Sequence, residues 1–373
     1  MYKFLNVFIC LFFYLFLFGC KKDLSQKSKI FFGTNELTIP LMEGGIVAFP
    51  NLCTGVWEGE DVIGYYNYFE KRIELYGIES QDSVLMIPIR QEGPDAVGDI
   101  GKFYLINNKI ATHCNQSFFL LDRNGAIVDK SPWSRLDSSE NALVKAYRLQ
   151  FTTSNNNQSS YQEQDSFFYL NFIRRDIDNS NPAYYLENPY PIVRYNYRDH
   201  SFLPVSFSYP KQVVENIHTI GYTSDGCPQV DVQGDTLVFN FQLHDEIYSL
   251  INGELYEKTI PSTFFPESDP KALNAMDKNL AFRSINRFFP VQYDPYRNLY
   301  IRFQMKVNSI STEQQPSLTV LSSSLEEIDE VLLPNDLNPI FFFRPEAIYA
   351  AVKPDYLPDE NHLRFRPIYV EME

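Results

Sequence analysis

The chain of 373 residues carries 47 Asp and Glu against 32 Lys and Arg, which gives a formal net charge of −15 at pH 7. This acidity argues against nucleic acid as a partner, because binding to phosphates depends on clustered Lys and Arg. A chain of this length can also bury enough apolar surface to fold without disulfide bonds.

The N-terminus has the layout of a secretory signal. Lys3 precedes an apolar run that ends at Gly19-Cys20, and this run of about fifteen residues is shorter than the roughly 20 that a spanning helix needs. The stretch "LFGC" resembles the bacterial lipobox, which implies cleavage before Cys20 and attachment of diacylglycerol to its sulfur. We therefore expect a signal peptide at 1–19 and a polar tether at 20–29. A plain secreted protein and a membrane anchor remain alternatives.

Three cysteines lie beyond the predicted lipid site: Cys53, Cys114 and Cys227. An exported protein could form one disulfide among them and leave one thiol over. Their spacings form neither a disulfide framework nor a C-x-x-C metal pair. We expect buried free thiols, with a single bridge as the alternative.

The N-terminal part of the chain predicts short strands. Residues 29–41, "KIFFGTNELTIPL", indicate one early strand that could close a ring of blades by pairing with the C-terminal blade. Residues 45–89 contain five strand-like runs, one more than a four-stranded blade holds. A connection with three Gly and one Pro follows, "RQEGPDAVGDIG", which cannot continue a strand.

Residues 82–130 show the clearest pattern. Short apolar and aromatic runs are separated there by Asn- and Gly-containing turns, which is typical of an antiparallel meander. A second copy covers residues 229–259. We predict that Asn124-Gly125 and Asn252-Gly253 form equivalent type I′ turns, and their spacing of 128 residues gives about 64 per blade if two blade steps separate them.

The other segments are less regular. A third blade is expected from 142–207, with the polar insert 154–165 as a solvated hairpin loop. The stretch 270–286 has apolar residues at helical spacing and predicts the one strong helix. Strand-like runs in 287–333 and 339–373 predict the fifth and sixth blades, and the last may need N-terminal strands to complete it.

These repeats predict an all-β fold, a six-bladed β-propeller formed by residues 30–373. The 354 residues that would follow cleavage divide into six blades at about 59 each, close to the observed step. Seven blades would need about 50 each, which the spacing disfavours. The 31 Phe and 25 Tyr fit packing between wedge-shaped blades, although a sugar-stacking surface is an alternative reading.

The lipobox, the tether and the pattern "IPIRQEGPDAVGDIG-KFYL" followed by "FFLLDRNGAIV" resemble an uncharacterised family of bacterial lipoproteins with a TolB-like six-bladed β-propeller. This resemblance covers nearly the whole chain after Cys20. It implies a fold and a location in the cell envelope, on the outer membrane of a Gram-negative bacterium. It implies no catalytic residues.

No motif for chemistry is evident. The sequence has no G-x-S-x-G, no P-loop and no G-x-G-x-x-G. No pair of histidines has zinc-ligand spacing, and we interpret His244 and His200 as surface turn residues. The five histidines are His113, His200, His218, His244 and His362. We predict no catalytic residue, no metal site and no cofactor.

Two acidic groups suggest a functional hypothesis. Glu58, Glu60 and Asp61 beside Trp57 could bind a cation or act as an acid-base pair, but a solvated charge cluster is the simpler reading. The Gly-rich connection between the first two blades could line one mouth of the propeller. Its charged residues are the best candidates for a functional rim: Arg90, Glu92, Asp95 and Asp99.

Two functions therefore compete. The first is a non-enzymatic binding or scaffold module, monomeric and anchored to the membrane through its N-terminal lipid, that engages a protein or glycan partner at the cell envelope. The second is a propeller-type hydrolase or lyase acting on sugars or lactones. A fold alone cannot decide between them, because one fold hosts many functions.

Overall fold

The structure is a computed structural model that describes residues 28–43, 52–100, 102–114, 117–132, 147–150, 161–162, 166–174, 177–178, 181–188, 190–220, 227–265, 286–307, 314–357, 359 and 361–372. The predicted signal peptide, Cys20 and residues 270–285 of the predicted helix lie outside these residues. No helix in the described ranges has the length and hydropathy to cross a membrane.

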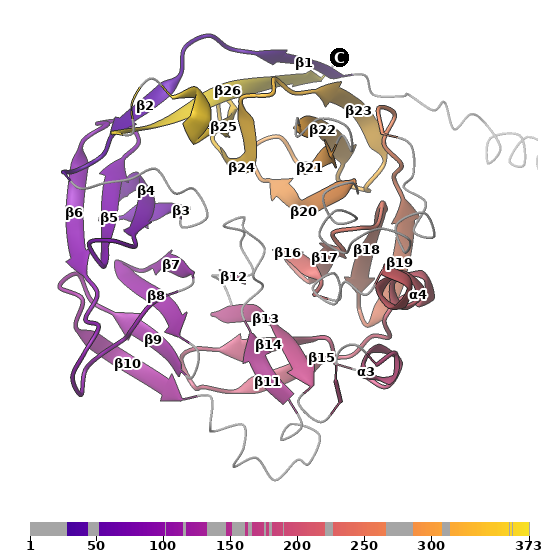
Figure 1. The fold of residues 1–373 in the computed structure, drawn as a ribbon, viewed down its shortest axis with the longest axis horizontal. Coiled ribbons are helices and arrows are strands. Elements are labelled where there is room, and N and C mark those ends of the chain that lie inside the picture. Colours follow the sequence, from indigo (N-terminus) through magenta and orange to yellow (C-terminus); the bar gives the residue numbers. More distant parts are fainter. Residues whose placement is uncertain are drawn as a thin grey trace, which may run out of the picture.

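Six antiparallel sheets stand around a common axis and form a six-bladed β-propeller, as predicted (Figure 1). Blade 1 holds β3 (Leu52–Trp57), β4 (Glu60–Asn67), β5 (Arg72–Gly77) and β6 (Ser83–Pro88), and blade 2 holds β7 (Phe103–Ile106), β8 (Lys109–Cys114), β9 (Ser117–Leu121) and β10 (Ile127–Pro132). Blade 3 holds β11 (Tyr147–Gln150), β12 (Tyr161–Gln162), β13 (Phe167–Arg174), β14 (Ile192–Asn196) and β15 (Phe202–Val205), and blade 4 holds β16 (Gln229–Gln233), β17 (Thr236–Asn240), β18 (Glu246–Ile251) and β19 (Glu254–Thr259). Blade 5 holds β20 (Arg287–Asp294), β21 (Leu299–Val307), β22 (Gln314–Ser322) and β23 (Glu327–Leu332), and blade 6 holds β24 (Leu337–Phe343), β25 (Ile348–Val352) and β26 (His362–Met372).

The N-terminal segment completes blade 6. It forms two strands rather than the one that the sequence predicts, β1 (Ser28–Phe32) and β2 (Leu37–Pro40), and both pair antiparallel with β26. Arg366 on β26 donates to Glu36 (2.8 Å) and Asp336 (2.7 Å), which links the loop between β1 and β2 to the start of β24. The two ends of the chain therefore close the ring together, as the sequence predicts.

Each neighbouring pair of blades encloses its own hydrophobic cluster. Six such clusters are present among the described residues, and together they follow the ring through blades 1 to 6 and back to blade 1. In the cluster between blades 2 and 3, for example, the rings of Phe118 and Phe168 lie 5.4 Å apart. A fully buried Phe stabilises the fold by about 1.5–3 kcal/mol, so most of the abundant aromatic side chains serve packing between blades.

Two of the expected strand assignments change. Of the five runs expected in 45–89, the first, 45–49, lies outside the described residues, and the described part of blade 1 has four strands. A turn in which Glu58 and Gly59 have φ of +50° and +90° divides the run 54–61 between β3 and β4. The sequence predicts a hairpin loop for the insert 154–165, but Tyr161 and Gln162 form β12, which pairs with β13 beside β11. Both β11 and β12 thus belong to the interrupted inner strand of blade 3.

Helices occur outside the one segment for which the sequence predicts a helix. The helix α4 (Lys211–Ile220) and the short helix α3 (Ala183–Leu186) lie beside blades 3 and 4, and a 3₁₀ turn, η4 (Pro354–Tyr356), follows β25 (Figure 1). Val213 and Val214 of α4 are buried against the apolar cluster between blades 3 and 4. The sequence predicts helix largely at 270–286, and α4 is a further amphipathic helix of ten residues that packs on the ring.

The two Asn-Gly turns are not equivalent in conformation. Asn252 and Gly253 have φ of +51° and +83°, as a type I′ turn requires. At the other turn only Gly125 has a positive φ (+76°), because the Asp122 carboxylate accepts hydrogen bonds from the backbone of Asn124 (2.8 Å) and Ala126 (2.9 Å). The prediction of two type I′ turns is wrong for the first. Both turns nevertheless join the last two strands of their blades, so the repeat spacing holds.

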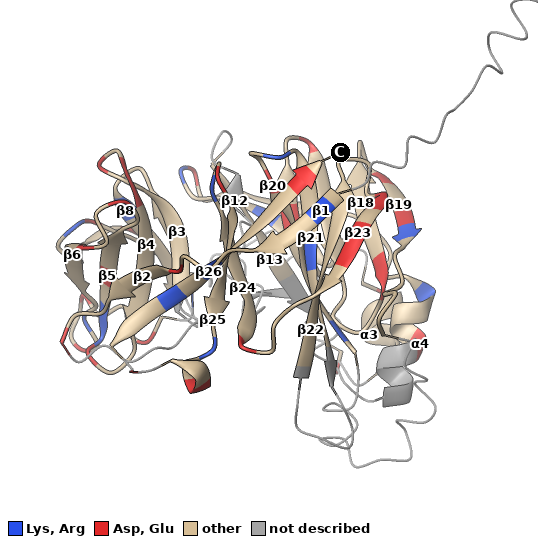
Figure 2. Ribbon diagram, turned by 90° about the horizontal axis from the view of Figure 1, so that it is seen from above, with Lys and Arg blue, Asp and Glu red and all other residues tan. Residues whose placement is uncertain are grey.

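Charged side chains lie mostly on turns and outer strands. Figure 2 shows Asp and Glu along β19 and β23 and on the loops that connect strands. The acidic net charge is therefore carried by the periphery of the ring, away from the apolar packing between blades.

Candidate functional site

A cavity of about 370 Å³ opens at the axis of the ring. Its walls come from the innermost strands of five blades, β3, β7, β16, β20 and β24, and from the turn after β20. The residues that line it are Cys53, Thr54, Tyr104, Leu105, Asp231, Val232, Gln292, Tyr293, Pro295, Tyr296, Phe341, Phe342 and Phe343. Its volume falls within the 300–1,000 Å³ of small-molecule sites.

The propeller topology explains why these residues meet. Each of the five inner strands pairs with one described strand of its own blade, on the side away from the axis. Each blade turns its two faces to the neighbouring blades and the edge of its inner strand to the axis, so adjacent residues of an inner strand, such as Cys53 and Thr54, can both line the cavity. Tyr104 lies at the border of face and edge, because its ring packs on Phe168 (5.1 Å) while it also lines the cavity.

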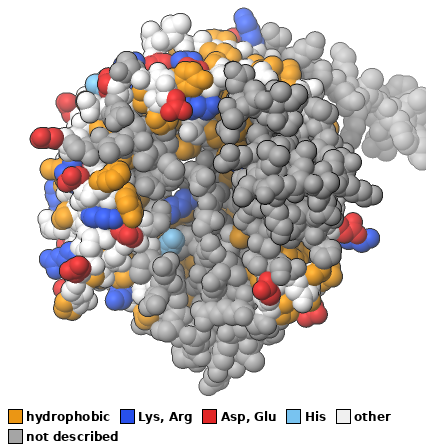
Figure 3. Space-filling view, viewed as in Figure 1, with side chains coloured by type: hydrophobic (Ala, Val, Ile, Leu, Met, Phe, Trp, Pro, Cys, Tyr) orange, Lys and Arg blue, Asp and Glu red, His pale blue; other side chains and the backbone are white. Residues whose placement is uncertain are grey.

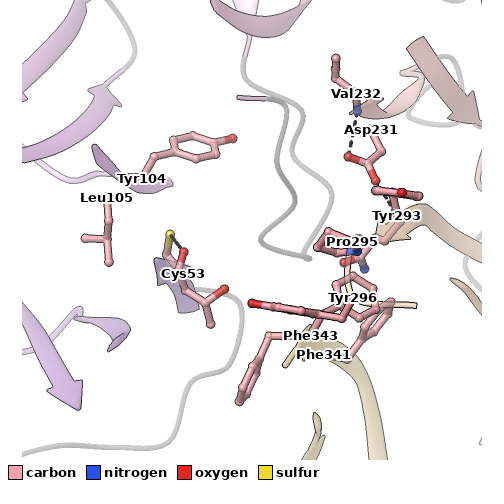
Figure 4. Close-up of a pocket in the computed structure, with 13 residues that line it drawn as sticks. Cys53, Tyr104, Leu105, Asp231, Val232, Tyr293, Pro295, Tyr296, Phe341 and Phe343 are labelled. Carbon is pink, nitrogen blue, oxygen red and sulfur yellow. Dashed lines mark hydrogen bonds between the residues drawn. The ribbon is translucent and has the colours of Figure 1, made fainter. Parts of the chain in front are cut away.

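Six of the thirteen lining residues are aromatic. Tyr296 is the most accessible, with 52% of its surface exposed, while Phe341 and Phe342 are 7% exposed. Phe341 stacks on Phe303 at 4.5 Å, which holds this wall rigid. Figure 4 shows Tyr104 and Cys53 on one side of the space and Tyr296 and Asp231 on the other. Aromatic faces thus line opposite sides of the cavity.

Among the described residues that line the cavity, Asp231 carries the one carboxylate, and this carboxylate is hydrogen-bonded to the main chain. Its two oxygens accept hydrogen bonds from the backbone N–H of Val232 (2.8 Å) and of Tyr293 (2.5 Å), and the side chain is 3% exposed. This arrangement joins blade 4 to blade 5. A carboxylate held in this way is poorly placed to move a proton or to bind a metal ion.

Gln292 offers an unsatisfied polar group at the same cavity. Its side chain is 5% exposed, and its amide nitrogen has no hydrogen-bond acceptor among the described residues. A buried donor without an acceptor costs about 1–3 kcal/mol, so such a group in a cavity wall is a natural contact for a ligand oxygen.

Three titratable side chains cluster where blades 1 and 2 meet the cavity. The Lys102 ammonium lies 5.6 Å from the centre of the Tyr104 ring, and burial lowers the pKa of Lys102 to about 8. Burial, together with the Lys102 charge, lowers the pKa of His113 to about 3. Burial raises the pKa of the Cys53 thiol to about 11. At neutral pH this cluster therefore has one cation, a neutral imidazole and a neutral thiol.

The cysteines partly follow expectation. Cys53 is a buried free thiol, and Cys227 is half-buried. The side chain of Cys114 lies outside the described residues. Because burial keeps the Cys53 thiol protonated, it acts as a small apolar wall residue rather than a nucleophile.

The four residues predicted as a functional rim lie on the exposed loop between β6 and β7. Arg90 and Asp95 are 3.6 Å apart within the loop, and Asp99 accepts a hydrogen bond from Lys71 (2.7 Å). Glu92 is exposed. None of the four is among the residues that line the axial cavity, so their role as a rim stays a prediction.

The acidic residues near Trp57 do not converge on one point. Glu58 accepts from Arg123 (3.0 Å), Glu60 accepts from the hydroxyl of Ser80 (3.0 Å), and Asp61 lies 4.0 Å from Arg344. Each carboxylate thus has a separate partner. The described residues contain no group of three or more His, Cys, Asp or Glu side chains that could hold a metal ion.

The histidines serve different roles. His200 sits in a turn with φ of +60° and contacts the Tyr195 hydroxyl (3.0 Å), as a turn residue should. His244 is 3% exposed and lies 3.7 Å from Glu246. The interpretation of His244 as a surface residue is therefore wrong. Blade 5 packs on this turn, where Arg302 donates to the backbone oxygen of Asp245 (2.8 Å). The side chain of His218 lies outside the described residues.

Comparison with known proteins supports the fold. No protein-family model matches the chain, and no curated protein matches its sequence. A member of the DUF4221 family from Bacteroides vulgatus is similar in structure, with a TM-score of 0.73 and 16% identity over 93% of this chain and 99% of that one. A protein from Bacteroides fragilis described as a candidate exported protein has a TM-score of 0.53 and 11% identity over 93% of this chain and 95% of its own. At these identities the likeness concerns the fold, a six-bladed propeller.

Proposed function

We propose that the protein is a non-enzymatic binding propeller of the cell envelope, and that its ligand occupies the axial cavity. The observation that carries this proposal is the cavity itself, about 370 Å³ at the ring axis with aromatic side chains on opposite walls. Pockets that combine apolar walls with a few polar groups are the usual sites for small ligands.

Of the two partners considered, a glycan fits this cavity better than a protein. Tyr104, Tyr293 and Tyr296 offer ring faces on which a sugar ring can lie, together with hydroxyl groups that can bind sugar hydroxyls. A folded protein partner would instead need a surface of at least about 1,000 Å² in total. The cavity can accept one or two sugar units, which could be the end of a longer chain.

A hydrolase or lyase has less support. Hydrolysis of a glycoside needs two carboxyl groups on either side of the bond, roughly 5–10 Å apart. In the part of the lining that the structure describes, the one carboxyl group is that of Asp231, and both of its oxygens accept hydrogen bonds from the main chain.

The test is binding of neutral and acidic glycan fragments, measured by isothermal titration calorimetry. Tyr296→Ala should weaken binding about tenfold, because loss of one stacked ring removes roughly 1–2 kcal/mol. Tyr356→Ala is the matched control, since Tyr356 is 58% exposed but does not line the cavity. Equal effects of the two substitutions, or no binding of any fragment, would contradict the proposal.

The proposed address rests on the sequence and on the description of one structural relative as a candidate exported protein. We infer that Cys20 carries the lipid and that the lipid holds the propeller at the outer membrane of a Gram-negative bacterium. Cys20→Ser should release the protein from the membrane fraction or leave it unprocessed. Unchanged membrane retention and mobility of this variant would refute lipid attachment.

A further inference from the structure

The axial cavity is chemically asymmetric from one side to the other. Blades 1 and 2 contribute Cys53 and Tyr104, with Lys102 beside them, and blades 4 and 5 contribute Asp231 and Gln292. Figure 4 shows Tyr104 across the space from Asp231. A ligand that fits both sides would place negative charge toward blade 2 and neutral oxygen atoms toward blade 5.

Lys102 lies beside the lining of the cavity, next to Tyr104. It precedes Tyr104 by two residues, so both side chains leave the chain on the same face, and its ammonium lies 5.6 Å from the Tyr104 ring centre. The residue is 8% exposed, and its backbone oxygen accepts a hydrogen bond from the Thr112 hydroxyl (2.7 Å). This ammonium is therefore buried next to a residue that lines the cavity, unlike that of a surface lysine.

His113 adjoins Lys102 on the next strand. The register pairs Phe103 with Thr112, so Lys102 and His113 follow at the same end of this strand pair, and the Lys102 charge contributes to the lowered pKa of His113. Its imidazole is neutral at neutral pH and has one N–H donor. Figure 3 shows both Lys or Arg and His side chains in the hollow at the centre of the ring. The blade 2 side of the channel thus combines a cation with a neutral donor.

Gln292 provides the second contact. Its buried amide nitrogen has no acceptor among the residues that the structure describes, and it belongs to β20, on the other side of the axis from β7. A hydroxyl oxygen of a ligand could accept from this donor without bringing negative charge near Asp231.

We propose that the ligand of the axial cavity is an acidic sugar, whose carboxylate faces Lys102 and His113 and whose ring hydroxyls reach Gln292. This inference rests on the proposed function and names its ligand class. Sugar rings suit the tyrosine faces of the walls, and hydrogen bonds between ammonium and carboxylate are strong in a partly dehydrated cavity. The acidic surface of the protein does not prevent this binding, because charges beyond about 8–10 Å are largely screened at physiological salt.

The experiment compares methyl β-glucuronide with methyl β-glucoside, which differ in having a carboxylate or a hydroxymethyl group on the same ring. We expect the glucuronide to bind the wild-type protein at least about tenfold more tightly, as is typical of a hydrogen bond to a charged group. Lys102→Met should weaken binding of the glucuronide more than binding of the glucoside and so remove this preference. Gln292→Met should weaken both sugars by a similar factor.

Lys130→Met is the matched control. Lys130 is on β10, the outer strand of the same blade, and its ammonium lies 5.2 Å from the ring centre of Phe119. The substitution therefore also removes a charge beside an aromatic ring, but away from the cavity. It should leave the preference intact. If Lys102→Met does not fold, comparison of the two sugars on the wild-type protein still tests whether the cavity prefers an acidic sugar.

The outcomes separate the two proposals. Equal binding of both sugars by the wild-type protein would overturn the acidic-sugar inference and leave the binding function standing. Binding of neither sugar would overturn both. Displacement of the glucuronide by millimolar inorganic phosphate, with no effect of Gln292→Met, would mean a simple anion site and would also overturn the inference.

Discussion

Replacement of Gly125 by Ala should destabilise the protein far more than the same change at other glycines with positive φ. A Cβ atom at position 125 would lie 2.0 Å from the backbone oxygen of Pro88 and 3.2 Å from its carbonyl carbon. An ordinary contact of this kind is roughly 3.5 Å. Pro88 ends β6 and is paired with Arg72 of β5, so the obstructing atom belongs to a hydrogen-bonded strand that cannot turn aside as a flexible side chain could.

The magnitude follows from two separable costs. A positive φ costs a residue with a Cβ about 1 kcal/mol relative to Gly, and crowding in a packed region adds about 1–3 kcal/mol. Gly98 has the same φ, +76°, but a Cβ added there would meet no atom within 4 Å, and Gly253 has φ of +83° with equally open surroundings. We therefore expect the free energy of unfolding to fall by about 2–4 kcal/mol for Gly125→Ala and by about 1 kcal/mol for each of the other two.

Urea denaturation of the three variants, followed by circular dichroism, provides the measurement. The difference between Gly125→Ala and Gly98→Ala isolates the contact with Pro88, because φ is the same. The double variant Gly125→Ala with Gly253→Ala should show additive losses, since the two turns are on separate blades and share no partners. Equal losses at Gly125 and Gly98 would refute the proposed contact between blade 2 and the end of β6.

Three further predictions concern reactivity, ring closure and pH. Cys53 should react with iodoacetamide at pH 8 much more slowly than an ordinary thiol, because its pKa of about 11 keeps the thiolate scarce; labelling as fast as that of free cysteine would contradict its burial. Arg366→Gln should lower the free energy of unfolding by about 2 kcal/mol, because its side chain is 21% exposed and pairs with two carboxylates, whereas Arg123→Gln, at 57% exposure, should cost less than about 1 kcal/mol. Affinity for methyl β-glucuronide should be constant below about pH 8 and fall above it, because the carboxylate binds the protonated ammonium of Lys102 and this contact is lost once the free protein loses that proton. The pKa values of His113 and Cys53 are about 3 and 11, so both groups stay neutral between about pH 6 and 9 and do not contribute to the change. An affinity that does not change with pH in calorimetry would exclude Lys102 as the contact.

Local patterns explain why the strands and the number of blades could be predicted. Alternating apolar residues predict a half-buried strand, and Asn-Gly pairs predict turns. Both kinds of structure depend on residues only a few positions apart in the sequence. The four strands of blade 4 appear at the predicted places, 229–259. The helix α4 also carried a local signal, Val213, Val214 and Ile217 after Pro210, although no helix is predicted there.

Tertiary packing determined the details that the local pattern could not. The Asn124-Gly125 turn has the same sequence signal as Asn252-Gly253, yet the Asp122 carboxylate selects a different conformation. His244 reads as a turn residue and lies in a turn, but contact with the next blade buries it. Burial of a turn depends on what the ring places over it, and no window of sequence contains that partner.

The candidate site depends most strongly on the closed ring. Cys53 and Phe343 line one cavity although nearly the whole chain separates them, and each is locally indistinguishable from a core residue of a strand. The sequence predicts the Gly-rich loop with Arg90 as a candidate site, because its charged residues and glycines lie within a short stretch of chain. No short stretch of sequence predicts the axial cavity, because its walls come from five inner strands of different blades. These strands meet around one axis in the closed ring, which the pairing of β1 with β26 completes.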